Sequence, residues 1–97
     1  MVKNRCRYKR GMIRVRLLGG VKRALGREYV DIYSEQLALR DLLSILASMS
    51  MKGMFYDPSD LIIVVNGVDS SLLGGMDTMI RRGDNVTVLT IVHGGDS

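Results

Sequence analysis

The sequence has few of the residues on which redox, metal and nucleophilic chemistry depend. It holds one cysteine, Cys6, one histidine, His93, and no tryptophan. A single cysteine cannot form an intramolecular disulfide or hold an iron–sulfur cluster, and this inventory is too thin for zinc. No nucleophile–base set, carboxylate pair or phosphate-binding loop is evident. These absences favour a carrier or binding protein over an enzyme, with no catalytic residues and no bound metal or cofactor.

Long hydrophobic runs are also missing. The longest unbroken apolar run, residues 61–65, is far too short to span a membrane. Arg14 and Arg16 interrupt the first candidate for the apolar part of a secretory signal. We therefore expect no membrane contact and a cytoplasmic location.

Acidic residues are absent from the first ten positions. The five cations of this stretch are Lys3, Arg5, Arg7, Lys9 and Arg10. The net charge of the whole chain is +4, so residues 11–97, with nine basic and ten acidic side chains, are close to neutral. Such a block is typical of a solvated tail, and it is also suited to holding an RNA backbone or a partner. We expect residues 1–10 to be a basic, flexible tail ahead of one domain over residues 11–93.

Hydrophobic periodicity predicts the first half of that domain. Apolar and polar residues alternate over 12–18 and again over 28–33, which indicates two half-buried strands. A glycine-rich stretch with a polar connection over 21–25 joins them, so we expect an antiparallel hairpin. The period then changes to about 3.6, which predicts one amphipathic helix over 38–51, ending before Gly53.

The second half is predicted to begin with a turn over 57–60, an apolar strand over 61–65 and a tight turn at 66–67. An irregular connection over 68–80 and a turn over 81–85 then lead to a final strand over 86–92. We expect strand 61–65 to be central in its sheet because it is apolar throughout.

This order of elements predicts an α+β fold of the β-grasp, or ubiquitin-like, type. The expected sheet is mixed, has four to five strands and carries one main helix packed on one face. The other face stays open. Apolar residues of 61–65 and 86–92 on that open face would form a patch that binds a partner.

A diglycine follows the last predicted strand. Composition alone gives about one Gly–Gly pair in such a chain, and three occur, so only position distinguishes Gly94-Gly95. Glycine lacks a Cβ atom, so residues 94–97, a diglycine tail with the two-residue extension Asp96-Ser97, can be threaded into a narrow site.

The segment from Asn66 to Gly95 resembles the ubiquitin-related modifier family, whose members act as ubiquitin-like modifiers and as sulfur carriers. The residues that carry the resemblance are Asn66, Asp69, Leu72-Leu73-Gly74, Asp77, Asp84 and His93-Gly94-Gly95. The small subunit of molybdopterin synthase and the sulfur carrier of the thiamine pathway are more distant relatives. Residues 12–53 match only at the level of the β-grasp pattern.

The resemblance implies chemistry at Gly95, the site of covalent attachment or of the thiocarboxylate. A ubiquitin-activating-type enzyme would use ATP and magnesium to convert the Gly95 carboxylate to an acyl-adenylate. The acyl group would then become a thiocarboxylate, with a sulfurtransferase or tRNA thiolation enzyme as partner, or be conjugated to lysines of substrate proteins. His93 and Gly94 would contribute to recognition of the tail. The family needs a terminal glycine, so we expect a protease to cleave between Gly95 and Asp96.

Two alternatives remain open. One is a dedicated sulfur-carrier subunit of a molybdopterin or thiamine pathway. The other is a non-covalent β-grasp adaptor or RNA-binding module, in which residues 1–10 matter and the tail is inert. For the carrier, we expect a monomer and only indirect contact with nucleic acid.

Overall fold

The computed structural model describes residues 12–50 and 57–90. In chain order its elements are β1 (Ile13–Leu18), α2 (Gly20–Leu25), β2 (Tyr29–Ile32), β3 (Gln36–Ala38), α3 (Leu39–Met49), η2 (Pro58–Asp60), β4 (Leu61–Val65), β5 (Val68–Asp69), η3 (Ser70–Leu72), η4 (Gly75–Asp77), β6 (Met79–Arg81) and β7 (Asn85–Thr90). No helix among these elements is long and apolar enough to cross a membrane.

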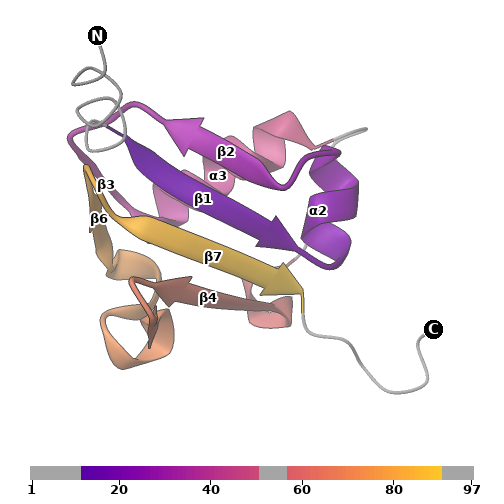
Figure 1. The fold of residues 1–97 in the computed structure, drawn as a ribbon. Helices are drawn as coiled ribbons and strands as arrows, with labels where there is room; N and C mark the ends of the chain where they lie inside the picture. Colours follow the sequence, from indigo (N-terminus) through magenta and orange to yellow (C-terminus); the bar gives the residue numbers. More distant parts are fainter. Residues whose placement is uncertain (1–11, 51–56, 91–97) are drawn as a thin grey trace, which may run out of the picture.

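The main sheet has five strands in the order β2-β1-β7-β4-β5 (Figure 1). β1 and β2 form the antiparallel hairpin expected from their alternating residues. β7 lies in the middle, parallel to β1 and antiparallel to β4. The predicted β-grasp fold is therefore confirmed. The middle strand is β7 rather than the 61–65 strand, which lies one position further out, between β7 and the two-residue edge strand β5.

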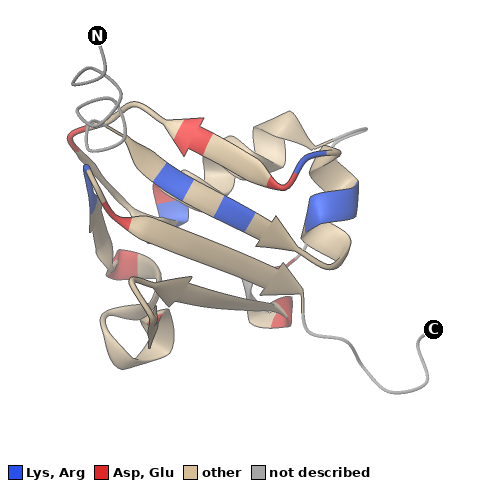
Figure 2. Cartoon of the chain, in the orientation of Figure 1, with Lys and Arg blue, Asp and Glu red and all other residues tan. Residues whose placement is uncertain are grey.

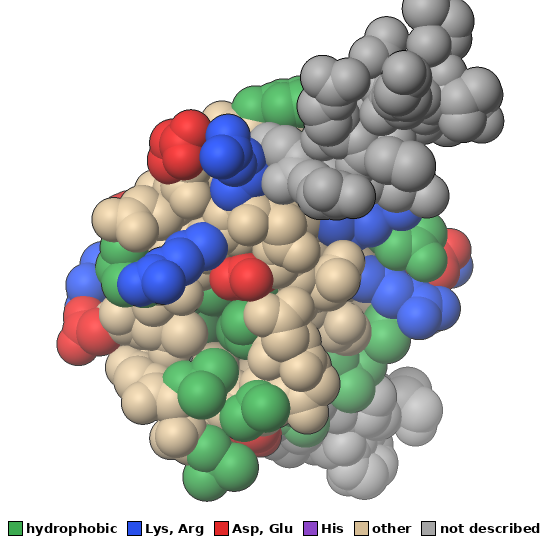
Figure 3. Space-filling view, turned by 60° about the vertical axis from the view of Figure 1, so that its left-hand side comes forward, with side chains coloured by type: hydrophobic (Ala, Val, Ile, Leu, Met, Phe, Trp, Pro, Cys, Tyr) green, Lys and Arg blue, Asp and Glu red, His purple; other side chains and the backbone are tan. Residues whose placement is uncertain are grey.

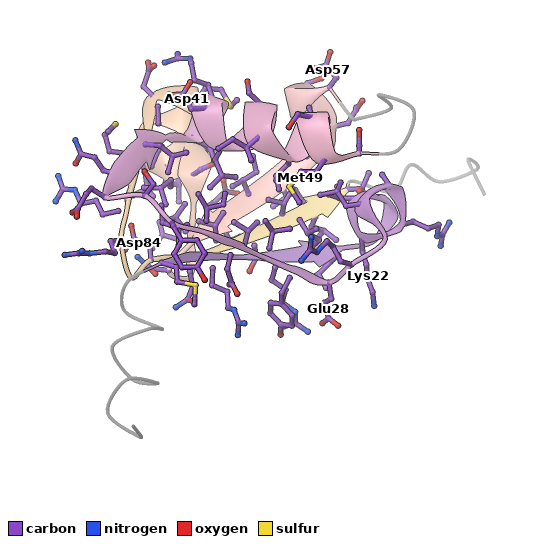
Figure 4. All side chains as sticks on the ribbon, turned by 90° about the horizontal axis from the view of Figure 1, so that it is seen from above. Lys22, Glu28, Asp41, Met49, Asp57 and Asp84 are labelled. Carbon is purple, nitrogen blue, oxygen red and sulfur yellow. The ribbon has the colours of Figure 1, made fainter. Side chains whose placement is uncertain are left out.

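The core fills the space between this sheet and α3, which covers one face (Figures 1 and 4). Side chains of β1 alternate between buried and exposed, as expected for a sheet with one covered face. The buried stripe of α3 consists of Leu39, Leu42, Leu43 and Leu46. Met49 also points into this space (Figure 4) and packs partly buried against the core. The predicted helix is thus confirmed, with its described end at Met49; Gly53 lies outside the described residues.

The connection over 21–25 was predicted wrongly as a polar loop. It is the short helix α2, which buries Val21 and Leu25. Gly26 ends it in the left-handed conformation (φ 74°), where glycine avoids the steric cost that a Cβ atom would bring. Six residues give only one i, i+4 apolar pair, too little periodicity to reveal a helix in sequence.

The stretch predicted as irregular, 68–80, also contains regular structure. It holds β5, η3, η4 and most of β6, and β6 pairs with β3 in a separate two-stranded sheet. That small sheet leads directly into α3, and the first amide of the helix, that of Leu39, donates to the Thr78 carbonyl at 2.8 Å. Pairings of two or three residues carry no visible alternation, which is why periodicity missed them.

Candidate functional site

The chain leaves the described part of the fold at the end of β7. Thr90, its last residue, is paired with Leu61 of β4, and the preceding Leu89 is paired with Leu18 of β1. Residues 91–97 therefore follow from the middle of one end of the sheet rather than from an edge strand.

A contact between α2 and β7 fixes that end. The Thr90 hydroxyl oxygen accepts a hydrogen bond from the Val21 amide at 2.9 Å. Gly19, just before α2, has a φ of +67°, and a Cβ atom there would be 3.6 Å from Leu89 Cδ1. The positive φ, rather than lack of space, is what favours glycine. Sequence reasoning gave Gly19, Val21 and Thr90 no role, because the contact joins positions 69 residues apart.

The open face carries an apolar strip beside this end. Register places Leu18 of β1, Leu89 of β7 and Ile62 of β4 in one row across three adjacent strands. Their neighbours in each strand point to the buried face, and Ile62 is 37% exposed. We call Leu18, Ile62 and Leu89 the tail-end strip. The expected apolar patch on the open face is thus present, although β7 also places polar Thr87 there.

Arginines border the strip on the open face of β1. Arg14 donates from Nε to the Asp31 carboxylate at 3.0 Å, and Arg16 pairs with Glu28 at 3.2 Å. The ring of Tyr29 lies below both guanidinium groups, with ring centroid distances of 4.7 Å for Arg14 and 5.9 Å for Arg16. Cation–π contacts of this kind hold the arginines in place on an exposed surface.

A basic corner lies at the same end of the molecule. Lys22 and Arg23 of α2, together with Arg27 after it, line a shallow hollow with Gly19 and Gly26. Lys22 Nζ lies 3.9 Å from Glu28 Oε1, at the edge of ion-pair distance (Figure 4). Figure 2 shows basic residues gathered on α2. Cations therefore lie on the α2 side of the end of β7 from which the tail departs, whereas Asp60 of η2 lies on the β4 side of that end.

The family residues Asn66 and Asp84 form a hydrogen-bonded clip at the other end of β7. The Asn66 amide group donates to Asp84 Oδ1 at 3.0 Å, and its carbonyl oxygen accepts from the Asn85 amide at 2.9 Å. Asp84 Oδ2 also accepts from the Arg81 amide at 2.7 Å. Asn66 has a φ of 51°, which asparagine tolerates better than most residues. These two residues set where β7 begins.

Asp69 and Asp77 have structural contacts too. Asp69 accepts from the Ser71 amide at 2.9 Å and from its hydroxyl at 2.8 Å, and these bonds lower the pKa of the Asp69 carboxyl. Hydrogen bonds from Ser59 lower the pKa of Asp57 in the same way. Asp77 pairs with Arg40 of α3. Asp69 thus stabilises the start of η3, and Asp77 pairs with α3. Sequence spacing could identify these two aspartates but could not reveal their partners.

The residues predicted to react or to be recognised, His93, Gly94, Gly95 and Asp96, lie outside the described residues. So do the basic segment 1–10 and Cys6. Within residues 12–50 and 57–90, no group of three or more histidine, cysteine, aspartate or glutamate side chains could hold a metal ion.

Comparisons with known proteins assign the family. The model of the ThiS family matches residues 15–95, most of the chain, and the chain belongs to this family of ubiquitin-like sulfur carriers. Its homologues are small ubiquitin-like carrier proteins. No curated protein sequence matches the chain.

Three solved structures have the same fold. Small archaeal modifier protein 1 of Methanosarcina acetivorans superposes with a TM-score of 0.68 at 21% identity, covering 88% of this chain and 97% of that chain. Urm1 of Trypanosoma brucei gives 0.64 at 22% identity, with 88% and 96% covered. A Pyrococcus furiosus protein assigned as molybdopterin converting factor subunit 1 gives 0.64 at 25% identity, with 84% and 98% covered.

Proposed function

We propose that this chain is a sulfur carrier and protein modifier that reacts through the carboxylate of Gly95. The observation that carries the proposal is the extent of the family match, which runs through Gly95 and stops before Asp96. The central position of β7 supports it, because the strand that leads to the tail is paired on both sides and its described end is therefore held in place. The tail-end strip and the basic corner supply a surface on which an activating enzyme would dock beside that tail.

The chemistry requires a free glycine carboxylate. Once Asp96-Ser97 have been removed by a protease, a Gly95 oxygen attacks the α-phosphate of ATP held with magnesium by the activating enzyme, and pyrophosphate leaves. A hydrosulfide ion then attacks the acyl carbon and displaces AMP, which leaves a thiocarboxylate for tRNA thiolation. Alternatively, a lysine amine takes the acyl group as an isopeptide. We place these reactions in the cytoplasm, where ATP and tRNA are available.

Intact mass tests this proposal directly. Chains ending at Gly95 and at Ser97 are incubated with ATP, magnesium and the cognate activating enzyme, and sodium sulfide is then added as the sulfur donor. We expect the adenylate, and then the replacement of one oxygen by sulfur, only on the chain that ends at Gly95. A Gly95 chain with the Ile62→Asp substitution on the tail-end strip should react more slowly at limiting enzyme. Adduct on the Ser97 chain with Asp96-Ser97 retained, or none on either chain, would contradict the proposal.

A dedicated cofactor-pathway carrier is the second candidate. The likeness to the Pyrococcus furiosus protein favours it, since that protein is assigned to molybdopterin conversion. Mass spectrometry of the protein purified from cells separates the two. Isopeptide remnants of Gly95 on many proteins support the modifier, whereas a single tight heteromer with a thiocarboxylate supports the cofactor pathway. A chain that keeps every cellular function without residues 94–97 would instead be a non-covalent adaptor.

A further inference from the structure

The described part of the fold carries a single lysine. The chain has four lysines and ten arginines, and Lys22 of α2 is the only lysine within residues 12–50 and 57–90. Cationic side chains also lie on the face shown in Figure 3, yet every described cation other than Lys22 is an arginine. A guanidinium group keeps its proton, whereas a lysine amine can lose it and attack an acyl carbon. Lys22 is therefore the acyl acceptor that the described fold itself offers.

Lys22 lies beside the strand end from which the tail departs. The amide nitrogen of the preceding residue, Val21, is 2.9 Å from the Thr90 hydroxyl oxygen. Covalent geometry then limits the distance between the Cα atoms of Thr90 and Lys22 to about 11 Å. Figures 1 and 4 show α2 beside this end of β7. The acceptor and the start of the tail are thus neighbours in the fold, although they are far apart in the sequence.

The tail is long enough to reach this amine. Residues 91–95 add five residues to Thr90, and an extended chain of that length spans about 17 Å. This span exceeds the Cα–Cα limit, and the flexible four-carbon stem of the lysine can cover part of the gap. A short tether that can bridge its two sites gives a local concentration on the order of millimolar. An activated Gly95 therefore meets Lys22 more often than it meets an amine of another molecule in dilute solution.

The contacts of Lys22 leave its amine accessible. Its side chain is 51% exposed, and Nζ lies 3.9 Å from Glu28 Oε1. Glu28 is shared, because its other oxygen accepts a hydrogen bond from Arg16 Nε at 3.3 Å. Exposed ion pairs of this kind contribute little stability, so Lys22 can leave Glu28 at small cost. Arg23 and Arg27, which line the same hollow, would favour the negatively charged intermediate that forms when an amine attacks an acyl group.

Two of the other lysines start from the far end of the sheet. Lys3 and Lys9 precede β1 in the sequence, and β1 runs parallel to β7 with Arg14 opposite Asn85. The start of β1 is therefore about 17 Å along the sheet from Thr90, at about 3.3 Å per residue. Lys52 lies outside the described residues, and the experiment below tests it by replacement.

We propose that Lys22 is an internal acceptor for the activated Gly95 acyl group, so that the chain closes on itself through an isopeptide bond. This inference rests on the proposed function, which supplies the acyl-adenylate. The neutral Lys22 amine attacks the acyl carbon and forms the C–N bond. The bond to AMP breaks, AMP leaves with its electron pair, and the nitrogen loses a proton to water. Closure follows once the activated end leaves the activating enzyme, and a closed chain neither receives sulfur nor modifies another protein.

A thioester at Gly95 tests this inference without the activating enzyme. The chain ending at Gly95 is released from an intein fusion as a C-terminal thioester and kept at mildly alkaline pH. Lys22 should displace the thiol and give a monomer lighter by a water molecule than the hydrolysed chain, with a branched peptide that joins Lys22 to Gly95. The rate should not depend on protein concentration. Because adenylation is not needed, failure of the proposed function would leave this result unchanged, and failure of closure would leave adenylation unchanged.

Matched variants identify the acceptor. Lys22→Arg keeps the charge and should slow closure by at least about tenfold, whereas combined replacement of Lys3, Lys9 and Lys52 by arginine should leave the rate within about twofold. In urea, closure at Lys22 should lose its preference over closure at the other amines, because the fold no longer holds Lys22 beside Thr90. Thermal melting checks that the variants fold. Hydrolysis alone, closure mainly at another amine, linked dimers as the main product, or an unchanged preference for Lys22 in urea would overturn the proposal.

Discussion

Replacement of Asn66 tests whether the clip at the start of β7 stabilises the fold. Asn66 makes two side-chain hydrogen bonds, to Asp84 and from the Asn85 amide, and its backbone is left-handed. Asn66→Gly removes the bonds but accepts the backbone conformation. Asn66→Ala removes the same bonds and also places a Cβ atom in that conformation. The difference between the two variants therefore separates side-chain bonding from backbone strain.

Expected magnitudes follow from these two contributions. The two exposed hydrogen bonds together contribute about 1–2 kcal/mol, so Asn66→Gly should lower the free energy of unfolding by that amount. Asn66→Ala should lose about 1 kcal/mol more, the cost of the left-handed conformation for a residue with a Cβ atom. In a domain of this size, each kcal/mol corresponds to roughly 4–8 °C in the melting temperature.

Urea unfolding followed by circular dichroism measures both losses. Asn85→Ala is the control, because it keeps the backbone amide that donates to Asn66 and removes only an exposed side chain; its effect should stay within about 0.5 kcal/mol. Equal stability of the Gly and Ala variants would refute the argument from backbone strain. A Gly variant as stable as the unchanged chain would show that the clip contributes nothing.

Three further expectations concern the core, the acid range and the α2–β7 contact. Leu46→Ala, which empties a fully buried site on α3, should cost about 2–5 kcal/mol in urea unfolding. The pKa of Asp69 is lowered below its ordinary 3.8, so its stabilising effect is complete above that pH and is lost as pH falls through the lower folded value. Asp69→Asn should therefore flatten the loss of stability below about pH 4. Thr90→Val should speed hydrogen exchange of the Val21 amide, whereas Thr87→Val on the open face should not.

Periodicity predicted the elements that repeat often enough to show it. The strand over 12–18 and the helix over 38–51 each carry several repeats, and both are present with ends within about two residues. α2 and the β3–β6 pair are too short to show a period, so their place depends on contacts made elsewhere in the chain. Helical structure at α2, for example, is fixed by packing of Val21 and Leu25 and by the bond to Thr90.

The candidate site, too, was predictable from sequence only in part. The family resemblance identified Asn66, Asp69 and Asp84 in the sequence. Their spacing could not show that these side chains form hydrogen bonds within turns of the fold instead of contacting a ligand. The tail-end strip needed strand register, because Leu18, Ile62 and Leu89 share a row only after three strands are aligned. Gly95 was predicted from its position after the last strand and from the family pattern, and it stays a prediction.

The parallel pairing of β1 with β7 has a consequence for how the protein is made. Arg14 lies opposite Asn85, so the first and last strands of the sheet meet across 71 intervening peptide steps. Contacts between such distant segments slow folding, because the entropy of closing a long loop is lost before the strand pairing can stabilise the chain. On the ribosome, β1 and β2 emerge long before their central neighbour exists. The nascent chain should therefore remain protease-sensitive until β7 has left the exit tunnel.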